Sequence, residues 1–205
     1  MFETAELGRK VTKREFKIQV PALRTALLKV QQELRREKKF QVMIVLGGVD
    51  GAGKSEMANT LSDWMDPRGI ATHAFGLPTE DERERPEYWR YWKTLPPRGD
   101  IAIYLGAWYL RPLLDNAYGR TGLATYDRDL NRIVAFEREL VNDGMLILKF
   151  WMHLGKKAQK KRLDALEKDP LTRWRVTDRE KKNWAIYDRF EVASDRLIHL
   201  SLIHI

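Results

Sequence analysis

Apolar residues along this chain fall into short continuous runs, separated by longer stretches with helical periodicity. The first run, FQVMIVL at 40–46, precedes two glycines and is typical of a strand buried on both faces. Similar runs cover 70–75, 101–105 and 145–150. Because helical patterns alternate with these strands, the sequence predicts an α/β fold: a doubly wound, mostly parallel sheet flanked by helices.

Helical patterns fill the intervals between the predicted strands. From Pro21 to the RREKK segment, apolar residues at helical spacing predict an amphipathic helix that leads into the core. Ranges 55–65 and 130–140 predict two further helices, each followed by a turn that contains glycine. The polar segment 79–100 is too charged for a core and predicts a helical insertion over the sheet edge.

A length of 205 residues favours one domain with appendages. We expect an N-terminal helical extension at 1–39 and one folded domain at 40–205. Within it, 155–190 is dense in Lys and Arg and lacks a long apolar run, which predicts a mobile helical arm outside the core. We expect Trp174 and Trp184 to pack this arm onto the body, with stacking on a base as the alternative.

Composition narrows the chemistry that the chain can carry. It contains no cysteine, which excludes disulfides, thiolate chemistry and cysteine-ligated metals. Its four histidines are scattered, so we expect no zinc cluster, and a metal would be a hard ion on oxygen ligands. No apolar run approaches the roughly 18 residues of a membrane span and the first residues lack a signal-peptide core, so we expect a cytoplasmic protein without a membrane partner.

The charge balance is strongly basic, with 37 Lys and Arg against 29 Asp and Glu and a formal net charge of +8. Such an excess predicts a polyanion partner, which could be a nucleic acid, a membrane surface or a chain of phosphates. Charge alone does not separate these three, and a solvated surface rich in Lys and Arg is an equally weighted alternative.

The most specific motif is the glycine-rich loop at 48–55, which matches G-x-x-x-x-G-K-[ST] between a predicted strand and a predicted helix. Its backbone N–H groups and the helix N-terminus would form a phosphate cradle, Lys54 would add positive charge, and the Ser55 hydroxyl would ligate Mg²⁺. A glycine-rich turn without a ligand is the alternative. The predicted phosphate-binding residues are Gly48, Gly51, Ala52, Gly53, Lys54 and Ser55.

Asp50 is unusual in such a loop, because phosphates repel a carboxylate unless Mg²⁺ or a lysine neutralises it. We expect Asp50 to orient the metal or the phosphoryl acceptor, with a turn residue bonded to its own backbone as the alternative. Nucleoside triphosphatases with this loop usually carry an acidic Mg²⁺ ligand at the end of a neighbouring strand, and no carboxylate follows 101–105 or 145–150 directly. Either Asp50 and Ser55 hold the metal, or turnover is poor.

The sequence resembles the second polyphosphate kinase family, P-loop kinases that move phosphoryl groups between polyphosphate and nucleotides. The resemblance runs from Arg35 to Arg196 and rests on GGVDGAGKS, WRYWKTLPPRGDIAIYLGAWYLRP, FERELVNDGMLILKFWMHL and KKAQKKRLDALEKDPLTRWRVT. Family members have Asp-Arg-Ser-Trp-Tyr-Asn-Arg after the third strand, whereas this chain has LGAWYLR at 105–111. The acidic residue and the first arginine are missing, as in the N-terminal half of the family's tandem-domain branch.

The resemblance implies a P-loop kinase fold with a basic helical lid, and a Mg²⁺-dependent transfer of phosphate from polyphosphate to AMP, giving ADP. It also implies homo-oligomers and no nucleic-acid partner. It implies that Asp50, Lys54 and Arg111 are catalytic. Arg111 and Lys149 would line the polyphosphate path, and Arg173 and Arg175 would belong to the lid. For Lys149 the alternative is a strand-end lysine that extends to solvent.

Two other functions stay open at this point. One is an ATP-dependent kinase of nucleosides or nucleotides, which shares the P-loop. The other is a non-catalytic domain that binds polyanion or supports dimerisation, which the missing carboxylate favours. Family domains continue beyond the basic arm into another strand and helix, so we expect these to be missing here. We also expect 201–205 to be non-native sequence, with a genuine last strand as the alternative.

Overall fold

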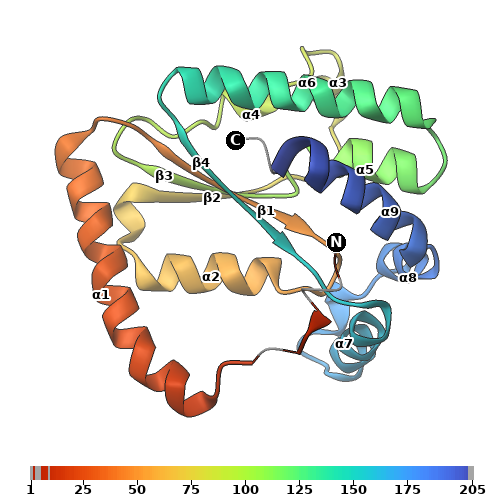
Figure 1. Cartoon of the computed structure of the whole chain (residues 1–205), viewed down its shortest axis with the longest axis horizontal. Helices are drawn as coiled ribbons and strands as arrows, with labels where there is room; N and C mark the ends of the chain where they lie inside the picture. The colour runs from red at the N-terminus through yellow and green to blue at the C-terminus, as the bar shows by residue number, and fades with distance from the viewer. Residues whose placement is uncertain (1, 3–5, 9, 203–205) are drawn as a thin grey trace.

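The computed structural model describes residues 2, 6–8 and 10–202, and its centre is a parallel sheet (Figure 1). The described strands are β1 (Val42–Gly48), β2 (Ile70–Ala74), β3 (Ile101–Leu105) and β4 (Leu146–Met152). They lie in the order β2-β3-β1-β4, and each neighbouring pair is parallel. The predicted strands and the parallel sheet are therefore confirmed, with ends that differ by at most two residues.

Strand register places the ends of the central strands at one edge of the sheet. Val42 is aligned with Ile101 on one side and with Leu146 on the other, so β1, β3 and β4 begin together. Because the strands are parallel, their carboxyl ends also meet at one edge, where ligands of open α/β sheets bind. The glycine-rich loop follows β1 at that edge.

Helices cover both faces of the sheet, because side chains of β1 alternate between two apolar clusters. Met43 and Val45 join the cluster on one face, and Ile44 and Leu46 join the cluster on the other. The first face is covered by α5 (Leu110–Ala117), α6 (Leu123–Asn142) and α9 (Tyr187–Leu197), and the second by α1 (Lys13–Glu37) and α2 (Lys54–Trp64). The doubly wound architecture is confirmed.

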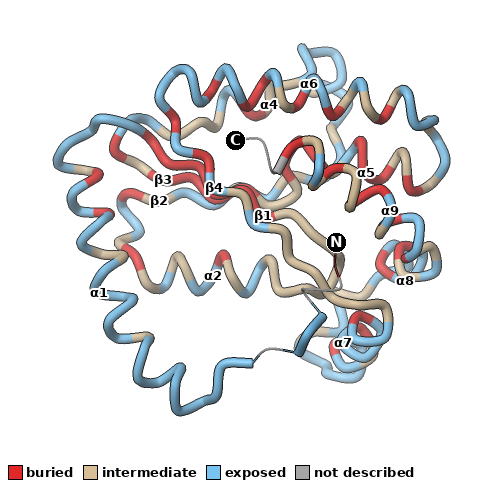
Figure 2. Tube along the Cα trace, viewed as in Figure 1, coloured by how far each residue is buried: buried red, intermediate tan, exposed pale blue. Residues whose placement is uncertain are grey.

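Helix α1 differs from its prediction in both start and burial. It begins at Lys13 with a capping box, in which Thr12 and Glu15 exchange side-chain-to-backbone hydrogen bonds, and Pro21 lies inside it. Within α1, which the structure describes in full, the buried residues are Gln31 and Leu34. Most of the apolar stripe stays exposed (Figure 2), so the expectation that it leads into the core was wrong for much of the helix.

The insertion between β2 and β3 forms two short helices, α3 (Glu80–Arg83) and α4 (Trp89–Trp92), with a 3₁₀ turn, η2 (Pro67–Gly69), before β2. Although most of this segment is charged, Tyr91 is buried in the larger apolar cluster and packs edge-on against Trp108 at 5.3 Å. The helical character of the insertion is confirmed, and Tyr91 belongs to the core with Tyr88 packed against it, whereas Trp92 is exposed.

The basic arm is helical as expected and consists of α7 (Lys156–Lys168), η3 (Arg173–Arg175) and α8 (Asp178–Ala185). Trp184 ties α8 to α7 through its indole N–H, which donates to the carbonyl of Lys156, whereas Trp174 is largely exposed. The expected end of the arm at 190 was too late, because α9 is a core helix that buries Phe190 and Leu197.

The described chain ends in a π-helical turn, η4 (Ile198–Leu202), so Ser201 and Leu202 do not continue as a strand. Residues 203–205, for which a non-native origin or a last strand was considered, lie outside the described residues. Among the residues described, no helix combines the length and the apolar character that crossing a bilayer requires.

Candidate phosphate-binding site

The glycine-rich loop begins at the end of β1, where its backbone lies in close contact with the end of β4. Gly48 has φ of +125°, and a Cβ there would lie 2.0 Å from the carbonyl oxygen of Met152. The next residue, Val49, donates its N–H to that same oxygen at 3.1 Å. Any side chain at Gly48 would displace β4, so glycine is required where the chain turns away from the sheet.

The loop ends at the uncapped N-terminus of α2. Its N-cap residue, Gly53, has φ of +95° and provides no side-chain hydrogen bond to the helix. The first N–H groups of a helix have no partner within the helix and carry the positive end of its dipole. Together with the exposed hydroxyl of Ser55, they form a cradle suited to an anion.

Lys54 lies folded back over the loop. Its Nζ donates to the carbonyl oxygens of Gly48 at 2.9 Å and Val49 at 2.8 Å. Burial lowers the pKa of Lys54, because desolvation disfavours the ammonium, and the negative charge of Asp50 partly opposes this. The ammonium is thus held by weak neutral acceptors at the place where a phosphate would provide a stronger one.

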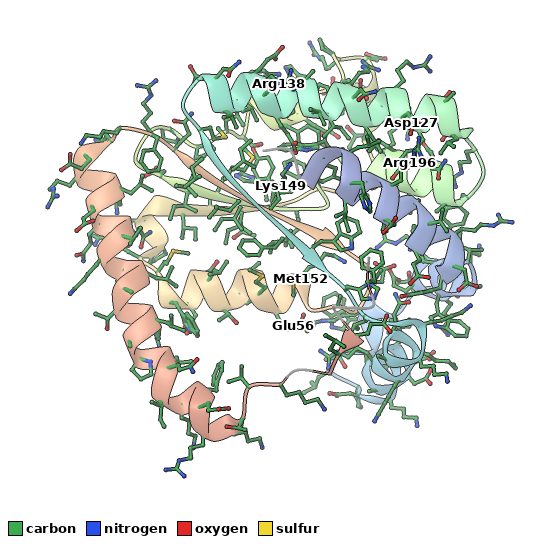
Figure 3. The ribbon with its side chains drawn as sticks, viewed as in Figure 1. Glu56, Asp127, Arg138, Lys149, Met152 and Arg196 are labelled. Atoms are coloured by element: carbon green, nitrogen blue, oxygen red, sulfur yellow. The ribbon has the colours of Figure 1, made fainter. Side chains whose placement is uncertain are left out.

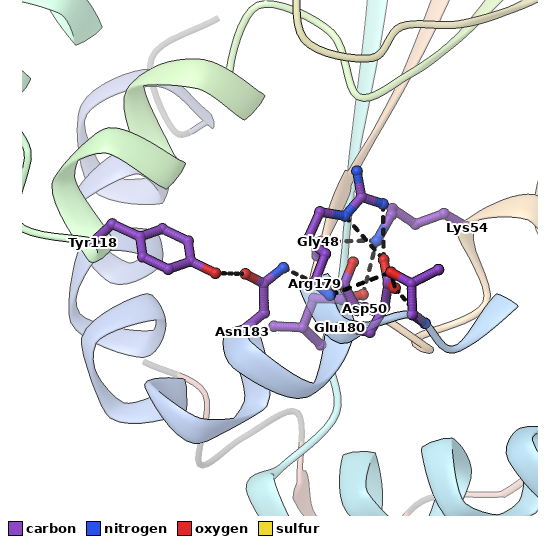
Figure 4. Close-up of polar contacts among 9 residues, drawn as sticks. Gly48, Asp50, Lys54, Tyr118, Arg179, Glu180 and Asn183 are labelled. Atoms are coloured by element: carbon purple, nitrogen blue, oxygen red, sulfur yellow. Dashed lines mark hydrogen bonds and ion pairs between the residues drawn. The ribbon is translucent and has the colours of Figure 1, made fainter.

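Asp50 is held by two helices of the basic arm, of which Figure 4 shows the contact with Asn183. Gln159 on α7 donates its amide N–H to the backbone carbonyl of Asp50 at 2.9 Å. Asn183 on α8 donates to the carboxylate Oδ2 at 2.7 Å, and its own Oδ1 accepts a hydrogen bond of 2.6 Å from the Tyr118 hydroxyl. The carboxylate of Asp50 therefore faces the arm, and the alternative of a turn residue bonded to its own backbone does not describe it.

Glu56 joins the arm to the first turn of α2, beside Ser55 (Figure 3). Its Oε1 accepts from Arg162 at 3.1 Å and from Arg175 at 3.2 Å. Arg175 thus lies against the helix that follows the loop, while Arg173, at the other end of η3, is exposed. These contacts place the basic arm at the mouth of the cradle.

Arg111 lines a different pocket from the one that Asp50 and Asn183 line. It occupies the first turn of α5, where its guanidinium is 3.7 Å from the carboxylate of Asp115. It faces a polar groove of about 520 Å³ that also contains four arginines and several carboxylates. The other arginines of this groove are Arg83, Arg85, Arg90 and Arg132.

The position of Lys149 corrects the expectation that it lines an open polyphosphate path. Its side chain is 5% exposed, and Nζ donates to Glu137 Oε2 at 3.0 Å and to the carbonyl oxygen of Ser201 at 2.5 Å. It does not extend to solvent either, which was the alternative. Lys149 points into the helical layer over the sheet (Figure 3), because the buried carboxylate of Glu137 holds it there.

The carboxyl end of β3 carries no carboxylate and turns tightly beside the end of β2. Leu105 ends the strand, and Gly106 follows with φ of +60°. A Cβ at Gly106 would lie 2.6 Å from the carbonyl oxygen of Phe75, which follows β2. The backbone conformation at position 106 therefore favours glycine, and an arginine there would be strained.

The oxygen donors at the loop fit a magnesium ion of the kind that also binds substrate phosphates. Among the described residues, no group of three or more His, Asp or Glu could hold a metal without help. Mg²⁺ commonly uses one or two carboxylates and completes its shell with phosphates and water. The Asp50 carboxylate and the Ser55 hydroxyl match that limited requirement, so their candidacy as metal ligands stands as a proposal.

Several contact residues of this site carried no signal in the sequence. Asn183, Gln159 and Tyr118 are isolated polar residues, and Glu56 follows the motif as one of many acidic residues. The separation between Asp50 and Asn183 is 133 residues, so only the tertiary fold brings them together. Gln159 could have been suspected as a contact residue only from its position as an uncharged polar residue on a helix rich in lysine.

Known proteins share both the sequence and the architecture of this chain. It is 41% identical to the Polyphosphate:AMP phosphotransferase of Pseudomonas aeruginosa, over 97% of this chain and 40% of that protein. A crystal structure of a polyphosphate kinase 2 from Pseudomonas aeruginosa PA01 superposes with a TM-score of 0.85 at 38% identity, over 98% of this chain and 40% of that one. Polyphosphate Kinase 2 from Arthrobacter aurescens gives a TM-score of 0.87 at 27% identity, over 95% and 70% of the two chains.

The chain spans less than half the length of the Pseudomonas aeruginosa protein that it matches. The profile of the family described as Polyphosphate kinase 2 (PPK2) matches residues 10–203, which is nearly the whole chain. With the P-loop kinase fold, the glycine-rich loop and the basic arm in place, the chain belongs to the polyphosphate kinase 2 family.

Proposed function

We propose that this chain transfers a phosphoryl group from inorganic polyphosphate to a nucleotide, with AMP as the preferred acceptor and ADP as the product. The observation that carries the proposal is the pairing of an uncapped phosphate cradle with a basic arm that contacts it through Glu56 and Asp50. A chain of phosphates would extend from the cradle along the cations of the arm. AMP as the acceptor rests on the likeness to the Pseudomonas aeruginosa protein.

The chemistry required of the protein is charge compensation and positioning, since phosphoryl transfer passes through a transition state with charge spread over the equatorial oxygens. The N–H groups at the start of α2 bind the transferred phosphate. Lys54 leaves the carbonyls of Gly48 and Val49 to meet it, because a phosphate oxygen is the stronger acceptor. Arg173 and Arg175 bind neighbouring phosphates from the arm.

Asp50 and Ser55 would hold Mg²⁺, which when bound neutralises charge between donor and acceptor oxygens. Asp50 would also orient the phosphoryl acceptor beside the cradle. Arg111 is proposed to bind phosphate from the polar groove beyond β3. We further propose that the chain acts in the cytoplasm as a homo-oligomer, without nucleic acid or membrane as partner.

The end of β3 favours slow transfer by this chain. Leu105 stands where other family members have an acidic residue, so one metal-orienting carboxylate is missing. Losing such a group removes several kcal/mol of transition-state stabilisation, roughly 3 kcal/mol for a single electrostatic contact. We therefore expect turnover well below the ~10 s⁻¹ of a median enzyme.

The test is ADP formation by the purified chain, supplied with AMP and polyphosphate or with AMP and ATP, in Mg²⁺ and in excess EDTA. We expect ADP from AMP and polyphosphate in Mg²⁺ only. ADP formed with ATP as the donor, and none with polyphosphate, would favour the nucleotide kinase instead. Tight polyphosphate binding with no product from either donor would favour the non-catalytic, polyanion-binding domain.

A further inference from the structure

Three elements that are far apart in the sequence meet at the carboxylate of Asp50. Tyr118 ends α5, Asn183 lies on α8, and Asp50 belongs to the glycine-rich loop. They form one continuous chain of hydrogen bonds, Tyr118 to Asn183 to Asp50, with donor–acceptor distances of 2.6 and 2.7 Å (Figure 4). Asn183 is buried, so its amide does not exchange these partners freely with water.

The direction of this chain is fixed by chemistry. An ionised carboxylate can only accept hydrogen bonds, so the NH₂ group of Asn183 must face Asp50. Its carbonyl oxygen then faces Tyr118, whose hydroxyl is the donor. The Tyr118 ring is itself fixed, because it packs edge-on against Phe190 of α9 at a centroid distance of 6.1 Å. The Tyr118 hydroxyl thus holds the amide of Asn183 in one orientation.

Because Asn183 bonds to one carboxylate oxygen of Asp50, the other oxygen is left to face the metal or the phosphoryl acceptor. Oδ2 accepts from Asn183, and no hydrogen bond to Oδ1 occurs among the described residues. The backbone of Asp50 is held as well, since Gln159 donates to its carbonyl oxygen. Asn183 and Gln159 both come from the basic arm, so the docked arm fixes the loop residue that faces it.

We propose that Asn183, kept in orientation by Tyr118, is a positioning residue for the Asp50 carboxylate. The inference rests on the proposed phosphoryl transfer, in which Asp50 orients metal or acceptor. Neither Asn183 nor Tyr118 needs to touch phosphate for this role. While the arm is docked as in this structure, Asn183 and Gln159 together keep Asp50 in one orientation.

The experiment compares Asn183→Ala, Tyr118→Phe and the double variant with the parent chain, in ADP formation from AMP and polyphosphate. Asn131→Ala, an exposed asparagine on α6, is the matched control. We expect Asn183→Ala to lower kcat about tenfold, the weight of one charge-assisted hydrogen bond, while KM for polyphosphate stays within about twofold. Tyr118→Phe should lower kcat about threefold in the parent and leave it unchanged in the Asn183→Ala background.

A kcat for Asn183→Ala equal to that of the parent, or losses that multiply in the double variant, would overturn the inference. So would a rise in KM with kcat unchanged, because that pattern belongs to a residue that binds substrate. A parent chain that makes no ADP would refute the proposed function alone. In that case thermal unfolding of Asp50→Ala, Asn183→Ala and their combination decides: shifts in Tm that fall short of additive support the contact, and additive shifts overturn it.

Discussion

Lys149 on β4 and Glu137 on α6 form an ion pair beneath the helical layer, with 3.0 Å between Nζ and Oε2. The Glu137 carboxylate also accepts from the indole N–H of Trp108 and from the hydroxyls of Tyr109 and Ser201. Burial lowers the pKa of Lys149, and the contact with Glu137 opposes that shift. The pair links the sheet to α6 and to the end of the described chain.

Replacing one partner of this pair should be much worse than replacing both. We expect Lys149→Met to lower the free energy of unfolding by about 3 kcal/mol, because it leaves a buried carboxylate without its counter-charge. Lys149→Met combined with Glu137→Gln should recover most of that loss, since the amide is neutral and can still accept. Urea unfolding of the parent and the variants measures this. A double variant less stable than Lys149→Met would show that the charge of Lys149 is not what Glu137 requires.

Lys54→Ala should remove phosphate binding without unfolding the chain. The Lys54 ammonium bonds to two carbonyls of its own loop, so its loss removes no contact between distant elements. We expect the Kd for polyphosphate to rise at least about tenfold, as for a lost charge-assisted contact. Lys29→Ala, an exposed lysine on α1, controls for the change in net charge. Unchanged affinity together with an unchanged melting curve would rule out the loop as the phosphate site.

The sequence predicted those elements whose apolar pattern depends on neighbouring residues alone. FQVMIVL predicted β1 because a strand of a parallel sheet is buried on both faces, and IAIYL predicted β3 for the same reason. Helix α1 began earlier than expected because the Thr12–Glu15 capping box outweighs the preference of Pro21 for a first turn. Phe190 was assigned to the end of the arm, because the charged residues around it hide an apolar stripe of α9 that packs against α5.

The candidate site was predictable only where it is built from consecutive residues. Gly48 to Ser55 form a local motif, so their geometry could be inferred from spacing. Lys149 could not be placed in this way, since its direction depends on Glu137 and on Ser201, which is 52 residues away. The Asp50 partners are equally remote, so the sequence could single out the carboxylate but not what holds it.

Arg173 and Arg175 should contribute to the salt dependence of polyphosphate binding. Each phosphate that a cation neutralises releases counterions, so Arg173→Gln with Arg175→Gln should reduce the slope of log K against log salt by about one to two. Arg138→Gln, an exposed arginine on α6, should leave the slope unchanged. Fluorescence anisotropy with labelled polyphosphate at several salt concentrations gives the slopes. Equal slopes for the parent and the double variant would make η3 a solvated surface with no part in binding.

Buried tyrosines should make the chain unstable at high pH. Burial raises the pKa of Tyr91, Tyr104 and Tyr187 to about 12, because the phenolate is poorly solvated there. Their stabilising effect is complete below the unfolded-state pKa of about 10 and is lost as pH rises through about 12. The lowered pKa values of Lys54 and Lys149 act in the opposite sense, and their effect is complete near pH 10.5.

Stability should therefore fall steeply between about pH 10.5 and 12, and urea unfolding across that range measures it. Tyr104 is fully buried, so Tyr104→Phe should make the fall shallower by up to about 3 kcal/mol. The same variant loses the hydrogen bonds to the Thr94 hydroxyl and the Tyr91 carbonyl at every pH, so the slope and not the absolute stability is compared. A parallel curve for the variant would mean that Tyr104 does not titrate in this window.

The end of β3 offers the most direct test of why transfer by this chain should be slow. Leu105→Asp restores a carboxylate at the sheet edge beside the loop, so we expect faster ADP formation and a lower Mg²⁺ concentration for half-maximal rate. Leu105→Asn is the matched neutral control and should show neither gain. Adding Gly106→Arg should not help, because φ of +60° is unfavourable for a side chain and its Cβ would lie 2.6 Å from the Phe75 carbonyl. Gly106→Ala alone should lower the free energy of unfolding by more than ~1 kcal/mol for the same reasons. A Leu105→Asp chain no faster than Leu105→Asn at saturating Mg²⁺ would show that the missing carboxylate does not limit the rate, and would leave Asp50 as the principal metal ligand.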